Sequence, residues 1–540
     1  MNKNNIKLAK GLILLCCLLY NMKDLLNFNG GIKNERMDNF SICSLFRCNA
    51  LYLAFIFSKK SNNVGDYFLG GRGMGSWLTA LSAQASDMSS WLLMGLPGAV
   101  YLSGLGEAWI AVGLGIGTYL NWLLVAKRLR NYSYVTGDAI TIPEYFQNRF
   151  NAKSTALRVT CAIIIFIFFL VYTASSFNAA AKLLQTVFGI QYQVGLLIGV
   201  VVIMAYTFMG GYFAVVWTDF FQGMLMFFAL LIVPIVAYAF IKADFSSVVS
   251  EMPGYMNFLK ESDGSTSTWQ YVVSNLGWGL GYFGMPHILV RFMSIKSSSM
   301  IKKSRRIAIV WVIITLVASV AVGVLGYVYL FQTEGTVLEG AASETIFMVL
   351  VQRLTPGFIA GILLCAIVAA IMSSSDSQML VTASAISNDI YKTIFRKEAT
   401  DKELLRVSKI AVIAVAVIAF VLALNPDNSV MNLVSYAWAG LGAAFGPAMI
   451  LSLYWNRMTM KGALAGMVSG GLGVLFWNTC LTESSPIFGS KFVICDTGLY
   501  ELVPAFILSV VVIVVVSLID KKPSQQVYDE FNRVCTENFD

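Results

Sequence analysis

The run WLTALSAQASDMSSWLLMGLPGAVYLS, residues 77–103, decides how this chain folds. It is long and apolar enough to cross a membrane, because a hydrocarbon core about 30 Å thick takes about 20 helical residues. Asp87 lies about 15 Å into this span, near the midplane. An ionisable group at that depth is costly unless it is paired or hydrated, so it indicates a functional site. A protonated or hydrogen-bonded packing aspartate is the alternative.

A second span, residues 267–293, is also interrupted, and lies five spans after the first, so the two run in opposite directions. Glycines and prolines interrupt both spans, with serines beside Asp87 in the first. Broken spans at matched positions of two inverted halves indicate the central site of a secondary transporter, where free carbonyls bind a cation. Ordinary helix packing is the alternative, because glycine and proline are frequent in membrane spans. The second span contains Gly277, Gly279, Gly281, Gly284 and Pro286.

Composition predicts a membrane protein with many spans. Of the 540 residues, 57% are hydrophobic and 13% are charged, whereas a soluble domain has about 25% charged residues. A helix stub is expected at 343–354, and a further span at 41–57 would carry Arg47 in its middle. Twelve spans are expected near residues 77–103, 105–126, 158–186, 192–209, 214–241, 267–293, 307–331, 357–388, 407–425, 430–455, 461–480 and 500–519.

The charge distribution predicts orientation and excludes a nucleic-acid partner. The net charge is +8, but the basic residues form short clusters between apolar runs, as the positive-inside rule describes, rather than a binding stripe. The loops on one side hold most of the Lys and Arg, and the other side receives Lys242, Lys260 and Lys491. We expect the first side and the C-terminus to be cytoplasmic. No obligate protein partner is evident.

The scarcity of catalytic side chains argues against an enzyme. His287 is the single histidine, and a membrane enzyme would need a convergent acid–base or metal cluster. We therefore expect no catalytic residues. His287 and Arg291 lie one turn apart near the end of the second broken span, a position typical of snorkelling or capping. A nutrient sensor would need a signalling domain, for which a tail of residues 520–540 is too short.

The run AAIMSSSDSQ, residues 369–378, places hydroxyl groups and Asp376 inside the eighth span. Hydroxyls and backbone carbonyls suit a hard cation, whereas imidazoles and thiolates suit zinc. Serines that bond back to their own helix are the alternative. Asp219, in the first turn of the span at 214–241, is expected either to cap that helix or to help an ion leave. Aromatic residues in these spans either line a pocket or serve as packing and interface anchors.

Several long motifs occur in order: GDYFLGGR (65–72), LSAQASDMSSWLLMGLPGAVYLSGLGEAW (81–109), TIPEYFQNRF (141–150), YTFMGGYFAVVWTDFFQG (206–223), GYFGMPHILVRFM (281–293) and AAIMSSSDSQML (369–380). Together they resemble the solute:sodium symporter family, and within it the bacterial sodium/proline symporters. The similarity covers roughly residues 60–520. It implies an all-α polytopic membrane protein with a five-plus-five inverted-repeat core of the leucine-transporter type and about 12–13 transmembrane helices.

The resemblance also implies how the chain is organised. Residues 1–57 form an N-terminal segment that could hold a leading helix, although they do not resemble that of the family. The expected units after it are a cytoplasmic loop at 58–76, a first five-helix repeat at 77–241, a second and inverted repeat at 267–455, two additional helices at 461–519 and a cytoplasmic tail at 520–540.

Site residues follow from the resemblance by position. It implies sodium binding by the carbonyls of Ala85, Met88 and Ala370 and the hydroxyls of Ser373 and Ser374. The sodium-linked carboxylates are Asp87 and Asp219, the latter in ion release. The positions that surround the substrate in proline transporters match Tyr172, Trp278, Tyr282 and Pro286, and Ser89 bears on both ion and substrate.

Three positions depart from the family pattern. Ser374 stands where threonine is expected and keeps the hydroxyl, while Ser90 and Met285 stand where glycine and glutamine are expected. The resemblance implies a secondary transporter that imports L-proline across a bacterial plasma membrane by alternating access, with Na⁺ as coupling ion and no other cofactor. The alternatives are a sodium- or proton-coupled symporter for another small amino acid or carboxylate, or a transporter-like nutrient sensor.

Overall fold

The computed structural model describes residues 64–209, 211–241, 245–335, 337–482 and 492–537, and these are almost entirely helical. Within them, nine helices are long and apolar enough to cross a membrane. This number is below the twelve expected spans partly because the second broken span divides into short helices and because the second half of the first is continuous with the next span. The expected segment 1–57, with its span at 41–57, lies outside the described residues.

The first five spans follow a short helix, α3 (Val64–Leu69), and a turn, η1 (Gly70–Arg72), in the segment expected as a loop. The first span is divided into three pieces, and a short helix, α8, connects the second and third spans. The elements are α4 (Ser76–Asp87), η2 (Trp91–Gly95), α5 (Leu96–Ser103), η3 (Gly104–Glu107), α6 (Ala108–Leu120), η4 (Asn121–Val125), α7 (Ala126–Val135), α8 (Ile142–Arg149), α9 (Ala156–Phe188), α10 (Tyr192–Met209) and α11 (Tyr212–Phe240).

The next five spans follow α12 (Ser246–Glu251) and repeat this order, again with a divided first span. The expected stub at 343–354 is present as η7 and α16. The elements are α13 (Trp269–Gly277), η5 (Trp278–Gly284), α14 (Pro286–Ser294), η6 (Ser298–Met300), α15 (Ile301–Glu334), η7 (Gly340–Thr345), α16 (Ile346–Leu354), α17 (Gly357–Ser384), η8 (Ala385–Phe395), α18 (Asp401–Leu422) and α19 (Val430–Tyr454).

Three further helices complete the described chain: α20 (Met460–Cys480), α21 (Leu502–Ile519) and α22 (Gln525–Thr536). The last is amphipathic and lies in the segment expected as a polar tail. Its apolar side packs across the end of α7, where the Phe531 ring lies 6.4 Å from that of Tyr132 and 5.4 Å from the Arg149 guanidinium. The tail is therefore a docked helix.

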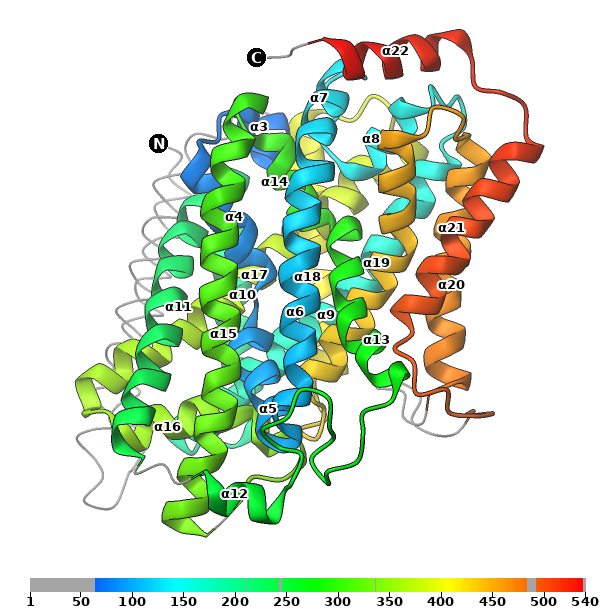
Figure 1. The fold of residues 1–540 in the computed structure, drawn as a ribbon. Coiled ribbons are helices and arrows are strands. Elements are labelled where there is room, and N and C mark those ends of the chain that lie inside the picture. Colours follow the sequence, from blue (N-terminus) through cyan, green and yellow to red (C-terminus); the bar gives the residue numbers. More distant parts are fainter. Residues whose placement is uncertain (1–63, 210, 242–244, 336, 483–491, 538–540) are drawn as a thin grey trace, which may run out of the picture.

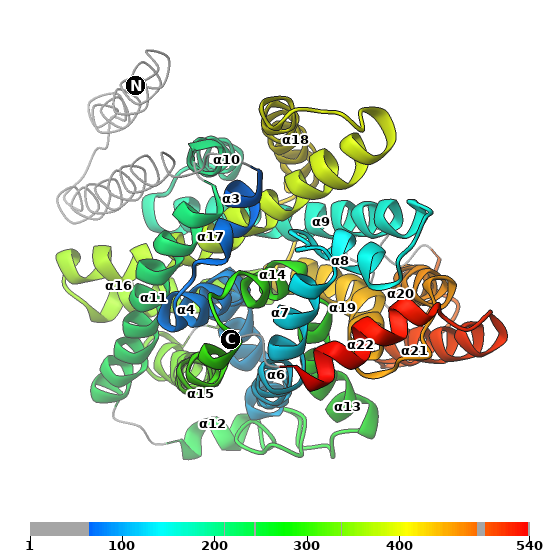
Figure 2. The ribbon, with the colours of Figure 1, turned by 90° about the horizontal axis from the view of Figure 1, so that it is seen from above.

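The two broken spans run in opposite directions through the centre of the molecule. Figure 1 shows α4 above α5, whereas α13 lies below α14. In the view from above, α4 and α14 lie inside a ring formed by α11, α15, α7, α19, α9 and α17 (Figure 2). Both breaks are thus enclosed by other helices, and this arrangement is what an inverted repeat requires.

Glycines allow the second break to sit between α6 and α19. A Cβ atom on Gly117 of α6 would lie 2.2 Å from the carbonyl oxygen of Gly279. On the other side, a Cβ atom on Gly281 would lie 1.9 Å from Nε1 of Trp438 in α19. Small residues permit such backbone approach between membrane helices. The second break is therefore held between α6 and α19 by close backbone contacts, which a side chain at either glycine would prevent.

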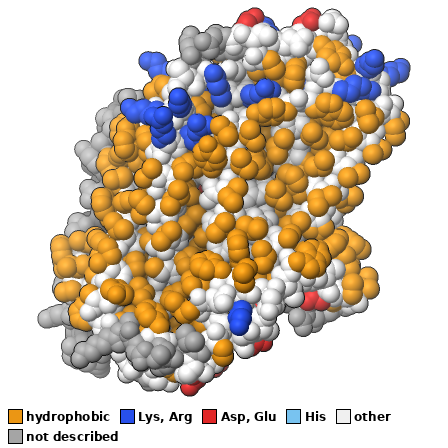
Figure 3. Space-filling model, in the orientation of Figure 1, with side chains coloured by type: hydrophobic (Ala, Val, Ile, Leu, Met, Phe, Trp, Pro, Cys, Tyr) orange, Lys and Arg blue, Asp and Glu red, His pale blue; other side chains and the backbone are white. Residues whose placement is uncertain are grey.

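The outer surface matches a membrane environment. Figure 3 shows hydrophobic side chains over most of the visible face, with Lys and Arg gathered towards the end where α7 and α14 terminate. Exposed apolar residues such as Ile235, Val317 and Val421 lie on several different helices. A soluble protein rarely exposes apolar patches of this extent. The chain is a multi-pass membrane protein.

Candidate functional site

The first break occurs because α4 ends at Asp87 and the chain resumes helical form only at Trp91. Met88 leaves the helical region, with φ −80° and ψ 75°. The backbone N–H of Ser89 then donates to the carbonyl of Asp87 at 2.9 Å. Asp and Ser favour such turns because their side chains compete for nearby backbone groups. Carbonyls at the end of α4 are thereby released from the helical ladder.

The second break has a different origin. The glycine-rich turn η5 ends at Gly284, and Met285 is extended, with φ −81° and ψ 105°. Pro286 then starts α14, a position that suits proline because the first N–H groups of a helix have no internal acceptor. The free N–H end of α14 consequently faces the interior, beside the released end of α4.

A buried carboxylate joins the two breaks. The Tyr282 hydroxyl donates to Oδ2 of Asp87 at 2.6 Å, and the Tyr172 hydroxyl donates to the Asp87 carbonyl at 3.4 Å. Asp87 is fully buried, and its other oxygen, Oδ1, has no hydrogen-bond partner among the described residues. The structure thus brings three residues from different helices to one point.

The residues expected to bind sodium come together on α4 and α17. The Ser373 hydroxyl donates to the Ala85 carbonyl at 2.7 Å and lies 3.3 Å from that of Ala370. The hydroxyl of Ser374 is buried and has no partner in the described part of the chain. Met88 lies at the end of α4, three residues after Ala85. Carbonyl and hydroxyl oxygens gathered in this way, one hydroxyl of them unpartnered, are the kind of ligand that a hard cation requires.

The neighbouring serines behave differently from this pair. The Ser375 hydroxyl donates to the Ile371 carbonyl of its own helix at 2.6 Å, so for this residue the alternative of intrahelical bonding applies. Ser377 and Asp376 are bonded to each other at 3.3 Å. They belong to a separate cluster nearer the end of α17. The serine run of α17 therefore contributes to two clusters rather than one.

This second cluster is built around a buried ion pair. Nη2 of Arg291 lies 3.2 Å from Oδ2 of Asp219, and the Ser82 hydroxyl donates to the same oxygen at 2.7 Å. Arg291 also donates to the hydroxyls of Ser82 and Ser377. The cluster links α4, α11, α14 and α17 one to two turns from the sodium residues.

Two expectations about this cluster are wrong. Asp219 does not cap a helix, because α11 begins at Tyr212 and Asp219 lies two turns further on, buried against Arg291. Arg291 and His287 do not snorkel or cap, because both are buried. His287 stands at the start of α14, where its ring packs 5.5 Å from that of Phe169. The sequence located these residues near a helix end but gave no sign of the ion pair.

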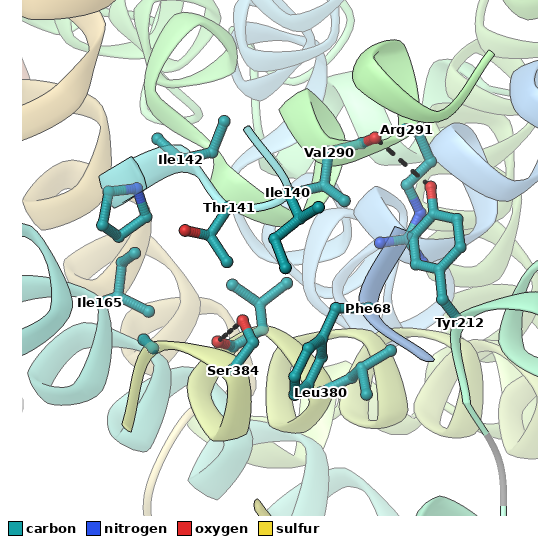
Figure 4. A pocket seen from close by; sticks show the side chains of 13 residues that line it. Phe68, Ile140, Thr141, Ile142, Ile165, Tyr212, Val290, Arg291, Leu380 and Ser384 are labelled. Carbon is teal, nitrogen blue, oxygen red and sulfur yellow. Dashed lines mark hydrogen bonds between the residues drawn. The ribbon is translucent and has the colours of Figure 1, made fainter. Parts of the chain in front are cut away.

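A pocket adjoins the Arg291 cluster. Figure 4 shows Arg291 and Tyr212 together on one side of it and Thr141, the N-cap residue of α8, towards the other. The Tyr212 hydroxyl donates to that of Ser294 at 2.7 Å. The lining is otherwise mainly apolar and comes from α3, α8, α9, α14 and α17, including Phe68, Ile140, Ile165, Val290 and Leu380.

A second buried ion pair joins the end of α9 to η7, on the opposite side of the molecule from the Arg291 cluster. It was not predicted from the sequence. Nζ of Lys182 in α9 lies 2.7 Å from Oε2 of Glu344 in η7. Glu344 also accepts from the Ser429 hydroxyl at 2.8 Å and from the N–H groups of Val430 and Met431 at 3.0 and 2.9 Å. Its carboxylate therefore caps α19 and neutralises Lys182. The only sequence sign was a carboxylate in a short helix stub.

The aromatic residues expected around the substrate occupy the second break and its neighbours. Trp278 and Tyr282 lie in η5, and Trp438 of α19 donates from Nε1 to the Trp278 carbonyl at 2.8 Å. The rings of Tyr282 and Trp438 meet edge to face at 5.1 Å. Of the remaining expected residues, Ser89 lies at the first break and Pro286 at the second.

Comparison with known sequences identifies related proteins. The model of the sodium:solute symporter family matches residues 67–470. The osmoregulated proline transporter OpuE of Bacillus subtilis is 45% identical over 476 residues, which cover 88% of this chain and 93% of that protein. A sodium/proline symporter of Escherichia coli is 44% identical over 494 residues, which cover 89% and 93%.

Comparison with solved structures identifies the fold. A Na⁺-coupled sialic acid symporter in a substrate-bound, outward-open state matches with a TM-score of 0.74 at 18% identity, covering 90% of this chain and 99% of that one. Mhp1, a nucleobase-cation-symport-1 family transporter in a closed conformation, matches with a TM-score of 0.51 at 12% identity, covering 86% and 98%. The fold is the inverted-repeat fold of the leucine-transporter type. The chain belongs to the sodium:solute symporter family and is a transporter rather than an enzyme.

Proposed function

We propose that this protein couples the inward movement of sodium to the import of L-proline across a bacterial plasma membrane by alternating access. One observation carries the proposal. Asp87 of the first break accepts from Tyr282 of the second at 2.6 Å, while Ser373 bonds the carbonyl of Ala85, two positions before Asp87. The ion residues and the substrate residues therefore share the end of α4. Relatives named as proline transporters support the choice of substrate.

Sodium is held between α4 and α17 in this proposal. A hydroxyl that already spans the gap between two helices can turn its lone pairs to an ion, and Ser374 offers a second, unpartnered hydroxyl. Asp87 supplies negative charge close by and Asp219 takes part in ion release. The proposed ligands are the carbonyls of Ala85, Met88 and Ala370 and the hydroxyls of Ser373 and Ser374.

Proline is held between the two breaks. The N-terminal end of α14 favours a carboxylate, the released carbonyls of α4 favour an ammonium group, and aromatic faces favour the pyrrolidine ring. The proposed substrate residues are Ser89, Tyr172, Trp278, Tyr282 and Pro286. A zwitterion with an apolar ring satisfies all three kinds of group at once.

Sodium supplies the driving force. One sodium ion falling through 100 mV releases about 2.3 kcal/mol, and a tenfold concentration gradient adds about 1.4 kcal/mol. The sum of about 3.7 kcal/mol supports a concentration ratio of several hundred for proline. Coupling requires that sodium bind one conformation more tightly than the other. The proposed contacts that differ between conformations are those of Asp87 and of the Ser373/Ser374 pair.

The proposed orientation places the C-terminus in the cytoplasm. The clusters of Lys and Arg at one end of the molecule support it, because cytoplasmic loops carry an excess of these residues (Figure 3). With that orientation, the Arg291 pocket faces the cytoplasm and the Lys182–Glu344 ion pair lies towards the outside. The lipid bilayer is the remaining partner.

The proposal is tested by uptake of labelled L-proline into proteoliposomes. An inward sodium gradient is compared with an equal choline gradient at constant pH, and the expected result is accumulation with sodium only. Uptake that ignores sodium but follows a proton gradient would replace sodium by proton coupling. Uptake of a different small amino acid or carboxylate, with no uptake of proline, would overturn the substrate. Transport in neither case by a correctly reconstituted protein would contradict the proposal as a whole.

A further inference from the structure

An aromatic residue outside the two inverted halves contacts the proposed substrate site. Tyr500 immediately precedes α21, one of the helices after the ten-span core. Its ring stacks on that of Trp278 in η5, with centroids 5.3 Å apart and planes inclined by 20°. Trp278 is 5% exposed and is one of the proposed substrate residues. The stack therefore connects a segment with no repeat counterpart to the centre of the transporter.

The Tyr500 ring is itself fixed from two sides. Its hydroxyl donates to the Ser435 carbonyl of α19 at 2.6 Å, and its backbone N–H donates to the Ser274 hydroxyl of α13 at 2.9 Å. The Ser274 hydroxyl in turn donates to the Gly498 carbonyl at 3.3 Å. Because both the backbone and the hydroxyl of this half-buried tyrosine are hydrogen-bonded, its ring faces Trp278 in one fixed orientation.

The contacts continue from Trp278 to the carboxylate at the first break. Trp438 donates to the Trp278 carbonyl at 2.8 Å, and its ring lies 5.1 Å from that of Tyr282. Tyr282 then donates to Asp87. Trp438 thus fixes the backbone of Trp278, and Tyr500 fixes the plane of its indole.

We propose that Tyr500 is a positioning residue for substrate binding, which sets the orientation of the Trp278 indole from outside the inverted repeat. The inference rests on the proposed function, because it takes Trp278 to touch the substrate. An indole turns about two side-chain bonds, and offset stacking on a held ring restricts both. A side chain that is ordered before the ligand arrives removes an entropic cost from binding. Loss of the stack should therefore weaken binding without slowing the transport cycle.

The first test measures proline uptake kinetics in proteoliposomes at saturating sodium. Tyr500→Leu removes the ring and should raise KM for proline about five- to tenfold, the worth of an aromatic pair, with the maximal rate per transporter within about twofold. Tyr500→Phe keeps the stack and should restore KM to within about threefold of the unsubstituted protein. A fall in maximal rate at unchanged KM would overturn the proposal and assign Tyr500 a merely structural role.

Tyr454→Leu is the matched control. Tyr454 is the last residue of α19. Like Tyr500, it donates from its hydroxyl to a carbonyl, that of Leu124 at 2.8 Å, and packs its ring on a partner, the Arg128 guanidinium at 3.9 Å. It lies at the opposite end of α19 from Ser435. KM should be unchanged in this variant. An equal rise in both variants would show a general effect of losing a tyrosine and would contradict the proposal.

A second measurement needs no transported substrate. Hydrogen–deuterium exchange of η5 peptides covering Trp278–Gly284 is compared between the unsubstituted protein and Tyr500→Leu in the same detergent. Faster exchange confined to η5 and the start of α21 is expected, and unchanged protection would overturn the positioning role. A protein that shows this exchange difference yet fails to take up proline would contradict the proposed function and leave the positioning role supported.

Discussion

The two broken spans serve the same site but are broken by different means. In the first, Asp87, Ser89 and Ser90 end α4 with short polar side chains, and Asp87 and Ser89 are among the proposed ion and substrate residues. In the second, Gly279 and Gly281 leave no side chains, and neighbouring helices approach the bare backbone instead. The first break is made by polar side chains, and the second by glycines that let neighbouring backbones approach. Substitution of the polar residues in the first should therefore alter ion dependence, whereas substitution of the glycines in the second should alter folding.

The largest effect is expected for Gly281→Val. Its Cβ atom alone would lie 1.9 Å from Nε1 of Trp438, and the indole is fixed by its bond to the Trp278 carbonyl. Overpacking of this kind costs about 3 kcal/mol, so we expect loss of monodisperse protein in size-exclusion chromatography and loss of transport. Gly115→Val is the control, since a Cβ atom there meets nothing within 4 Å. Equal yields of folded protein for the two variants would contradict the close packing of Gly281 against Trp438.

Asp87→Asn should act on ion dependence instead. It keeps the shape and one acceptor for the Tyr282 hydroxyl but removes the charge. A hydrogen bond or ion contact to a charged group is worth about 1.5–3 kcal/mol, so the sodium concentration for half-maximal uptake should rise at least about tenfold. Folded yield should not change. Asp263→Asn, in an exposed loop, is the control. An unaltered sodium dependence in Asp87→Asn would contradict the proposed role of Asp87 in sodium coupling.

The pair Ser373→Ala and Ser375→Ala tests whether the hydroxyl that crosses between helices is the one that matters. Ser373 bonds Ala85 of α4, whereas Ser375 bonds its own helix. Removing a crossing ligand should raise the sodium requirement about five- to tenfold, and removing the other should change it less than about twofold. Uptake is measured over a sodium series. A reversed order of the two effects would place the ion elsewhere on α17.

Tyr282→Phe should give the smallest change. It deletes the hydroxyl that donates to Asp87 but keeps the ring against Trp438. The Tyr282 hydroxyl is not a proposed sodium ligand and the Asp87 charge is kept, so the sodium requirement should rise only about threefold. Tyr436→Phe on α19 is the control, because it removes a hydroxyl from a tyrosine whose ring packs on Phe168 rather than on Trp438. A loss of folded protein in Tyr282→Phe would mean that the second break also depends on this bond.

The fold could be predicted from the sequence because its decisive features are local. A carboxylate inside an apolar run and a cluster of glycines and proline in another each show a break without reference to the rest of the chain. The spacing of the spans then gave their opposite directions. The short helices at the start of the described chain and α22 at its end were not predicted, because neither is apolar enough to stand out.

The site was only partly predictable, since its contacts join residues far apart in the sequence. Ser373 and Asp87 were candidates from their own surroundings, but no local pattern pairs Asp219 with Arg291 or Lys182 with Glu344. Positions near apparent helix ends suggested capping for Asp219 and snorkelling for Arg291. The true start of α11 at Tyr212 removes the first possibility, and burial removes the second. Tyr500 carried no sequence feature that linked it to Trp278.

The docked helix α22 has a consequence for how the protein is made. Cys535 Sγ lies 3.8 Å from Arg128, which stands 407 positions earlier in the chain. At about 5–20 residues per second, a ribosome needs tens of seconds to cover that distance. Throughout that time, the faces of Tyr132 and Arg149 that Phe531 will cover stay open to chaperones and proteases. Docking of α22 is therefore the last of the described helix contacts to form, and a chain truncated before Gln525 leaves those faces of Tyr132 and Arg149 uncovered.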